Sequence, residues 1–153
     1  MARQGSLDLL KDPVAEALLG STIPARLAYN WTDGTPRVVP IWFHWTGDQI
    51  VLGSPAKAPK LKALPVNPRV ALAIDDHTVW PHKVLLMRGD AAVELQDDVV
   101  PEYALSATRY FGAEQGNAWV DTLRGKPMAR IAITPDWVGI LDFETRFPSA
   151  LGL

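Results

Sequence analysis

The sequence predicts an α+β protein, mainly β, in which six to seven antiparallel strands form a small, partly open barrel with flanking helices. Short apolar runs alternate with turn signals between residues 23 and 95, as in hairpin-connected strands. Residues 99–125 instead show helical periodicity. The chain has 153 residues, 48% of them hydrophobic and 21% charged, which fits a single globular domain over residues 1–153.

The first elements are a helix and a hairpin. Residues 7–19 carry leucine and valine at helical spacing, and Ser6 is a suitable N-cap. A strand over residues 23–31 follows, and the Asp33-Gly34 pair after it is a strong hairpin signal. The second strand is therefore expected over residues 37–45.

The middle of the chain continues with short strands. Residues 49–53 are expected to form the third strand, after which Pro59 suits the first position of a short helix. The fourth and fifth strands cover residues 69–75 and 83–95. Gly89 lies inside the fifth strand, where a lone glycine marks a bulge or bend.

The last third begins with helix and ends with strands. Gly112 is expected to break the helical segment 99–125, and a second short helical piece is expected to begin at Trp119. Its aromatic residues at helical spacing, Tyr103, Tyr110 and Phe111, favour core packing over a stacking platform. Two closing strands are expected, over residues 127–133 and 137–143.

Composition excludes several classes of protein. The formal net charge is −2, which gives no basic surface for nucleic acid or for an anionic membrane. The chain has no cysteine, so disulfides and thiolate metal sites are excluded, and no metal site is expected. It has no apolar run of roughly 20 residues and no signal-peptide pattern at its start. A cytoplasmic location is the expectation.

The second strand has two apolar faces. Val39, Ile41, Phe43 and Trp45 alternate with a second set that contains Pro40 and Trp42. Both faces must therefore be covered, one by the barrel interior and the other by a helix, a ligand or another subunit. Proline has no N–H and is excluded from central positions of a sheet, so Pro40 predicts a strand that is open on one side. A flat ligand could lie against such an edge.

Three lysines gather around the predicted short helix. These are Lys57, Lys60 and Lys62, of which Lys57 and Lys60 are poorly placed near a positive helix N-terminus unless an anion binds there. Ser54, just upstream, adds a hydroxyl donor. The alternative reading is that the lysines are ordinary solvated charges. Together with the open strand, they favour a phosphate site.

These residues carry a resemblance to a known family. The strand RVVPIWF followed by VLGSPAKAPKLKALPVNPRVAL resembles the pyridoxamine 5′-phosphate oxidase-like, flavin mononucleotide (FMN)-binding split β-barrel family. The order of elements agrees over about residues 20 to 95, and the Lys…Leu…Asn-Pro-Arg-Val run is its most specific part. The resemblance implies a homodimer with the cofactor between its subunits.

The resemblance also implies which residues bind the cofactor. Lys60 is similar to the family's phosphate lysine, and Arg37 to the arginine that opens the second strand. The backbone from Val39 to Trp42 would lie along the flavin ring. Trp80 could cover the ring from the partner chain, and the alternative reading is a packed loop tryptophan. The implied cofactor contacts are Arg37, Val39, Pro40, Ile41, Trp42, Ser54, Lys57, Lys60 and Trp80.

Departures from the family pattern limit the function that is implied. Trp42 and Pro59 stand where the oxidase has basic residues, Val84 stands in place of a glutamine, and the C-terminal arginine and histidine of the oxidase have no match. Vitamin B6 oxidation is therefore not expected. The expected activity is hydride or electron transfer on an unidentified small molecule, for which no catalytic residue is assigned.

Two alternatives remain open. The chain could be a reductase that uses the deazaflavin F420, whose acidic tail would suit Lys57 and Lys62. It could also be a non-catalytic flavin- or haem-binding protein, with His44 as a less favoured axial ligand. A plain surface or dimer contact is the preferred reading of His44.

Overall fold

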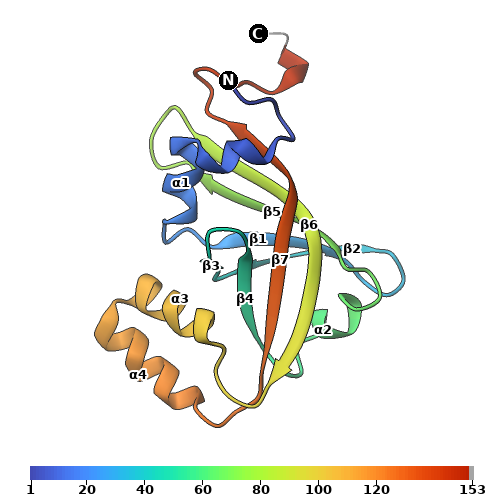
Figure 1. The fold of residues 1–153 in the computed structure, drawn as a ribbon, viewed down its shortest axis with the longest axis vertical. Helices are drawn as coiled ribbons and strands as arrows, with labels where there is room; N and C mark the ends of the chain where they lie inside the picture. The colour runs from blue at the N-terminus through green and yellow to red at the C-terminus, as the bar shows by residue number, and fades with distance from the viewer. Residues whose placement is uncertain (152–153) are drawn as a thin grey trace.

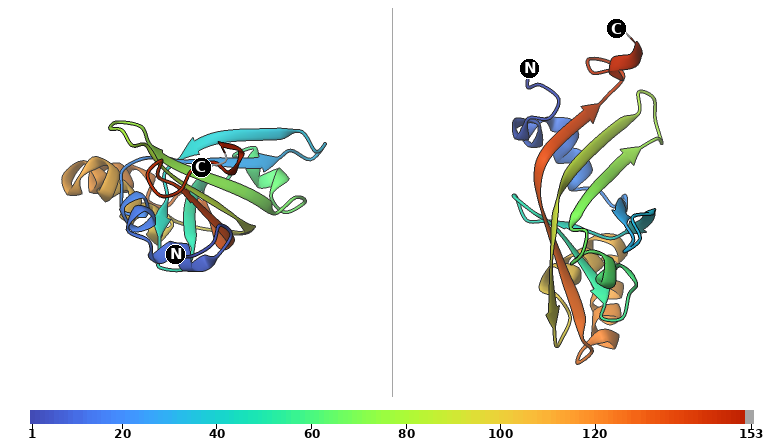
Figure 2. Two further views of the ribbon diagram at one scale, coloured as in Figure 1. Left: turned by 90° about the horizontal axis from the view of Figure 1, so that it is seen from above. Right: turned by 90° about the vertical axis from the view of Figure 1, so that its right-hand side faces the viewer.

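The computed structural model describes residues 1–151 as one antiparallel sheet, curled into a half-barrel, with helices beside it (Figure 1). The sheet has seven strands in the order β2–β1–β5–β6–β7–β4–β3, which confirms the mainly β, partly open barrel. The curl of the long strands is clearest in Figure 2. The strands are β1 (Ala25–Asn30), β2 (Pro36–Ile41), β3 (His44–Trp45), β4 (Ile50–Pro55), β5 (Arg69–Asp76), β6 (Lys83–Gln96) and β7 (Met128–Leu141). The helices are η1 (Leu7–Lys11), α1 (Pro13–Leu19), α2 (Lys60–Ala63), α3 (Pro101–Phe111), α4 (Ala113–Leu123) and η2 (Ser149–Leu151).

The barrel is split between its two edge strands, β2 and β3. These strands are consecutive in the chain and are joined only by Trp42 and Phe43, which cross from one edge of the sheet to the other. The prediction of a single strand over residues 37–45 is therefore wrong. The predicted alternation still holds across the crossing, because Phe43 is completely buried in the barrel core.

The long strands β6 and β7 form the spine of the sheet, and β7 runs without interruption. The prediction of two separate closing strands is wrong here, because Pro135 is accommodated at a bulge. Arg88 pairs with Trp137 and Gly89 with Pro135, so Asp136 is the extra residue. The bulge predicted at Gly89 is confirmed. A Cβ on Gly89 would lie 2.4 Å from the Thr134 carbonyl oxygen, so a side chain has no room there.

The N-terminal helix is broken in two. Ser6 caps η1 as predicted, but Asp12 is extended, with φ −70° and ψ 138°, and caps α1 through its side chain. The cause is Pro13, which disfavours helical backbone at the residue before it and takes the first position of α1. The predicted continuous helix over residues 7–19 is therefore wrong.

Helices α3 and α4 cover the outer face of β4 and β7. Gly112, at φ +84°, separates them as predicted, but α4 begins at Ala113, earlier than expected. Their buried side chains form a second apolar cluster with Val51, Met128 and Ala132, distinct from the cluster inside the barrel. This arrangement places aromatic side chains of α3 and α4 beside the split.

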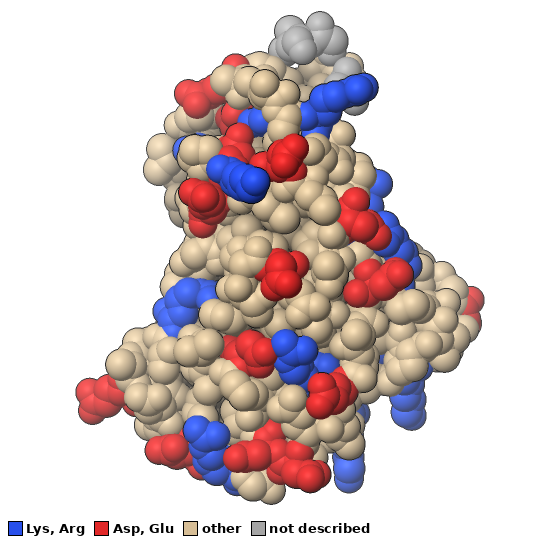
Figure 3. Space-filling view, viewed as in Figure 1, with Lys and Arg blue, Asp and Glu red and all other residues tan. Residues whose placement is uncertain are grey.

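Charged side chains of both signs are distributed over the surface seen in Figure 3. On the face shown in Figure 3, basic and acidic side chains are interspersed and form no patch of one sign. Over residues 1–151, no helix is long and apolar enough to span a bilayer.

Candidate functional site

A groove opens at the split of the barrel, between β2 and β4. Its volume is about 590 Å³, within the range of small-molecule sites. Strand β4 and the loop after it supply one wall, and β2 with the Trp42 crossing supplies the other. Helices α3 and α4 close one end. The lining residues are Pro24, Val39, Pro40, Ile41, Trp42, Gly53, Ser54, Pro55, Lys60, Tyr103, Phe111 and Trp119.

Two free strand edges face the groove. Strand β2 pairs only with β1. Pro36 and Pro40 are four residues apart in β2, so their backbone nitrogen atoms point to the same side of the strand. Because proline has no N–H to donate, these positions suit backbone atoms that point away from β1. Strand β3 pairs with β4 only at Ile50 and Val51, so β4 has no neighbour on that side beyond Val51. Backbone polar groups are therefore available to a ligand on both walls.

One end of the groove is polar. Ser54 is completely buried, and its Oγ has no hydrogen-bond partner among the described residues. A buried hydroxyl without a partner is costly, so its retention points to a group that binds there. Lys60, which opens α2 after the loop that follows β4, also lines the groove and is half-buried. Burial lowers the pKa of its ammonium, which no carboxylate accompanies among residues 1–151.

The other end of the groove is aromatic. The Trp42 ring stacks on Tyr110 with centroids 5.0 Å apart, and on Tyr103 at 6.0 Å. Phe111 meets Trp42 edge-on at 4.7 Å. The Trp119 indole donates a hydrogen bond to the Tyr103 hydroxyl at 2.8 Å, which ties α4 to α3. Four aromatic residues of this cluster line the groove, namely Trp42, Tyr103, Phe111 and Trp119, and they offer apolar surface to a flat molecule.

Six of the nine residues expected to contact a cofactor line the groove. They come from β2, the crossing, β4 and α2: Val39, Pro40, Ile41, Trp42, Ser54 and Lys60. Pro59 precedes α2 as its N-cap instead of occupying its first turn, and Lys60 opens the helix.

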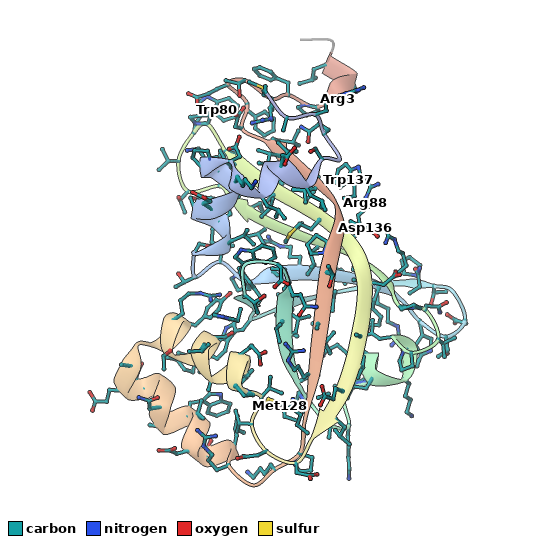
Figure 4. All side chains as sticks on the ribbon, viewed as in Figure 1. Arg3, Trp80, Arg88, Met128, Asp136 and Trp137 are labelled. Atoms are coloured by element: carbon teal, nitrogen blue, oxygen red, sulfur yellow. The ribbon has the colours of Figure 1, made fainter. Side chains whose placement is uncertain are left out.

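Three expected residues do not line the groove of this chain. Arg37 is exposed and lies over the Trp31 ring, 3.9 Å from its centroid. Lys57 is exposed on the loop before α2. Trp80 is 65% exposed, and Figure 4 places it at the opposite end of the molecule from Met128, which packs beside Gly53 in the groove wall.

The helical contribution to the groove was missed in the sequence. The sequence predicts core packing for Tyr103 and Phe111, but both side chains also line the groove, as does Trp119. Phe111 and Trp119 are 45% and 42% exposed, which is unusual for large aromatic residues of a packed helix pair. Helical spacing alone does not show that these aromatic side chains face a groove, because the groove is completed by β2, which is distant in the sequence.

His44, His77 and His82 do not line the groove. His44 lines a different cavity, and His77 pairs with Asp75 at 2.9 Å and stacks on His82. Within residues 1–151, no group of three or more potential ligands could hold a metal ion.

Comparison with known proteins supports the fold. No protein-family model and no curated protein sequence matches the chain. Among solved structures, an F420 reductase is 25% identical, with a TM-score of 0.62, over 81% of this chain and 94% of that one. The conserved hypothetical protein Rv2991 from Mycobacterium tuberculosis is 21% identical, with a TM-score of 0.69, over 99% of this chain and 94% of that one.

A third solved structure links the fold to the family that the sequence resembles. A putative pyridoxamine 5′-phosphate oxidase from Listeria innocua is 18% identical, with a TM-score of 0.59, over 88% of this chain and 97% of that one. The chain therefore has the same split-barrel fold as these solved structures, an F420 reductase and a putative pyridoxamine 5′-phosphate oxidase among them.

Proposed function

We propose that this protein binds FMN in the groove and is an oxidoreductase that transfers hydride or electrons to a small molecule. The observation that carries the proposal is the buried Ser54 hydroxyl without a partner, in a groove whose lining also includes the Lys60 ammonium. Lys60 is the one charged residue of the described groove lining. Such a pair suits a phosphate, which accepts hydrogen bonds and carries negative charge.

The shape of the groove matches the two parts of the cofactor. The polar end would hold the phosphate, and the aromatic end would take the flat ring against Trp42 and the edge of β2. When bound, a flavin supplies the hydride chemistry, and the protein supplies binding, orientation and electrostatics. The groove lining has no carboxylate and no histidine among the described residues, which suits a reaction that needs no protein acid or base. Its aromatic side chains would exclude water from the ring.

The test is a titration with FMN and with riboflavin, which has the same ring and lacks the phosphate. FMN should bind more tightly than riboflavin, and Lys60→Met should remove most of that difference. Lys57→Met, which also removes one lysine charge but lies outside the groove, is the matched control. If FMN and riboflavin bind equally, or if neither binds, the phosphate assignment is wrong.

F420 is the second candidate cofactor. Lys57 and Lys62 are both exposed near Lys60, where they could meet an acidic tail that extends out of the groove. The similarity to an F420 reductase is a further reason to test it. If F420 binds more tightly than FMN and Lys57→Met selectively weakens F420 binding, F420 is the better assignment.

We also propose that the active form is a homodimer. The outer face of β1, β2, β5 and β6 carries exposed Val38 and Ala28, with Ala71 and Ala73 beside them, around a shallow apolar depression. Trp80 is too far from the groove of its own chain to cover it, so only a second copy could supply it as a lid. Sedimentation should show a dimer that Ala71→Arg dissociates, and a monomeric wild type would contradict the proposal.

Haem binding and a non-catalytic role are weaker candidates. A haem would need an axial ligand, and the groove offers no histidine in its described lining because His44 faces another cavity. Turnover of an acceptor by the reduced protein would exclude a purely non-catalytic carrier.

A further inference from the structure

A second cavity lies on the other side of the Trp42–Phe43 crossing. It has a volume of about 580 Å³ and is formed by the N-terminal helices, β3 and the end of α3. In Figure 1, β3 lies between α1 and α3. None of its lining residues belongs to the lining of the groove: Leu7, Leu10, Lys11, Glu16, Leu19, Gly20, His44, Trp45, Gly47 and Arg109.

Arg109 is held in this cavity in a fixed position. Its Nε donates to the Ser21 carbonyl at 3.0 Å, and its Nη2 donates to the Phe43 carbonyl. The guanidinium also lies 4.8 Å from the centre of the Phe43 ring. None of the ion pairs among the described residues includes Arg109. The side chain is therefore oriented by the backbone, while its charge has no counterion.

The other charged residues near the cavity form no ion pair with the Arg109 guanidinium in the described part of the chain. Lys11 and Glu16 are both exposed residues of opposite charge. Glu102, which lies near His44, is already paired with Arg130 at 2.7 Å. His44 lines the cavity, and its buried Nδ1 has no partner among the described residues. Burial and then the Arg109 charge lower the pKa of His44, so a neutral imidazole adds a hydrogen-bonding group without adding charge.

The remaining walls are apolar. Leu7, Leu10, Leu19 and the Trp45 ring line the cavity opposite these polar groups. We propose that this cavity is a second ligand site, separate from the groove, for a small organic anion with an apolar ring or chain. The anionic group would pair with Arg109 and hydrogen-bond to His44, and the apolar part would lie against Trp45. The backbone contacts of Arg109 explain how it is held, and an anionic ligand explains its missing counterion.

Naphthalene-1-sulfonate and the neutral naphthalene-1-sulfonamide test this proposal, because they share a ring and differ in charge. The tryptophan indole N–H resonances of the ¹⁵N-labelled protein report the location, since Trp45 lies in the cavity and Trp119 in the groove. The sulfonate should shift the Trp45 signal to saturation at concentrations that leave Trp119 unmoved. The sulfonamide should bind about tenfold or more weakly, the range of one charged hydrogen bond.

Two variants separate the site from a fold effect. Arg109→Gln should weaken sulfonate binding about tenfold or more and leave sulfonamide binding unchanged, whereas Lys126→Gln, an exposed residue on the turn before β7, should change neither. Gly20→Trp should fill the cavity and abolish binding, since a Cβ there meets nothing closer than 3.4 Å. Equal affinity for the two probes, shifts at Trp119 instead of Trp45, or unchanged binding to the Gly20→Trp variant would each overturn the proposal.

Discussion

Replacing Ser54 by alanine should stabilise the cofactor-free protein and weaken cofactor binding at the same time. The Ser54 hydroxyl is fully buried and has no partner in the described chain, so folding removes it from water without compensation. Such an unsatisfied group costs about 1–3 kcal/mol. Ser54→Ala should therefore raise the free energy of unfolding of the cofactor-free protein by about 1 kcal/mol or more.

The effect on binding has the opposite sign. If Ser54 donates to a phosphate, the variant loses one hydrogen bond to a charged group, worth about 1.5–3 kcal/mol. This corresponds to a rise in the FMN dissociation constant of about tenfold to a hundredfold. Riboflavin affinity should not change, because riboflavin has no phosphate.

The two effects are measured by urea unfolding without cofactor and by titration with FMN and riboflavin. Ser21→Ala is the matched control, because the Ser21 hydroxyl donates to the Leu18 carbonyl at 2.7 Å and accepts from the Ile23 N–H at 3.2 Å. That variant should lose about 1 kcal/mol of stability and keep its cofactor affinity. The reasoning about Ser54 is refuted if Ser54→Ala lowers stability as Ser21→Ala does, or if FMN affinity is unchanged.

Three further predictions concern charge and packing. FMN affinity should fall as the pH rises through the lowered pKa of Lys60, below the pH at which an ordinary lysine deprotonates, and titrations of Lys60→Met should lack this decline. Burial alone would raise the pKa of Asp142, but hydrogen bonds, the side-chain one from Thr145 first, lower it below 3.8 overall. The stability that Asp142 contributes is thus present above about pH 4 and lost as the pH falls further, so the difference in unfolding free energy between wild type and Asp142→Asn should shrink in acid. Gly89→Ala should cost about 1–3 kcal/mol in urea unfolding, because its Cβ would lie 2.4 Å from the Thr134 carbonyl oxygen; unchanged stability would contradict this.

The barrel could be predicted because its signals are local. The Asp33-Gly34 turn fixes the first hairpin, and Pro40 fixes β2 as an edge strand. The errors also involve prolines. Pro13 breaks a helix that periodicity alone joins, and Pro135 lies between the two predicted closing strands but is accommodated by a bulge within one continuous β7. Whether a proline ends an element depends on the neighbouring strand, which the sequence does not show.

The polar half of the groove could also be predicted from residues close together in the chain. Ser54 and Lys60 are six positions apart, on either side of one loop. The aromatic half could not, because Tyr103 and Trp119 come to Trp42 from about 60 to 80 residues away, at a distance no local pattern reports. Helical spacing predicts core packing for Tyr103, Tyr110 and Phe111, and only the structure shows that Tyr103 and Phe111 also line the groove.

The prolines that seem unsuited to strands explain why the split stays open. An unpaired strand edge normally invites another strand, and proteins block such edges with proline or charge. Three of the groove residues are prolines, Pro24, Pro40 and Pro55, and they lie on both sides of the split. None can donate a backbone hydrogen bond, so neither edge offers a complete ladder to a strand of its own or another chain, while the carbonyl oxygens remain as acceptors. A groove with this edge chemistry excludes β pairing and stays accessible to a ligand, so Pro40 in β2 and Lys60 after β4 belong to one arrangement.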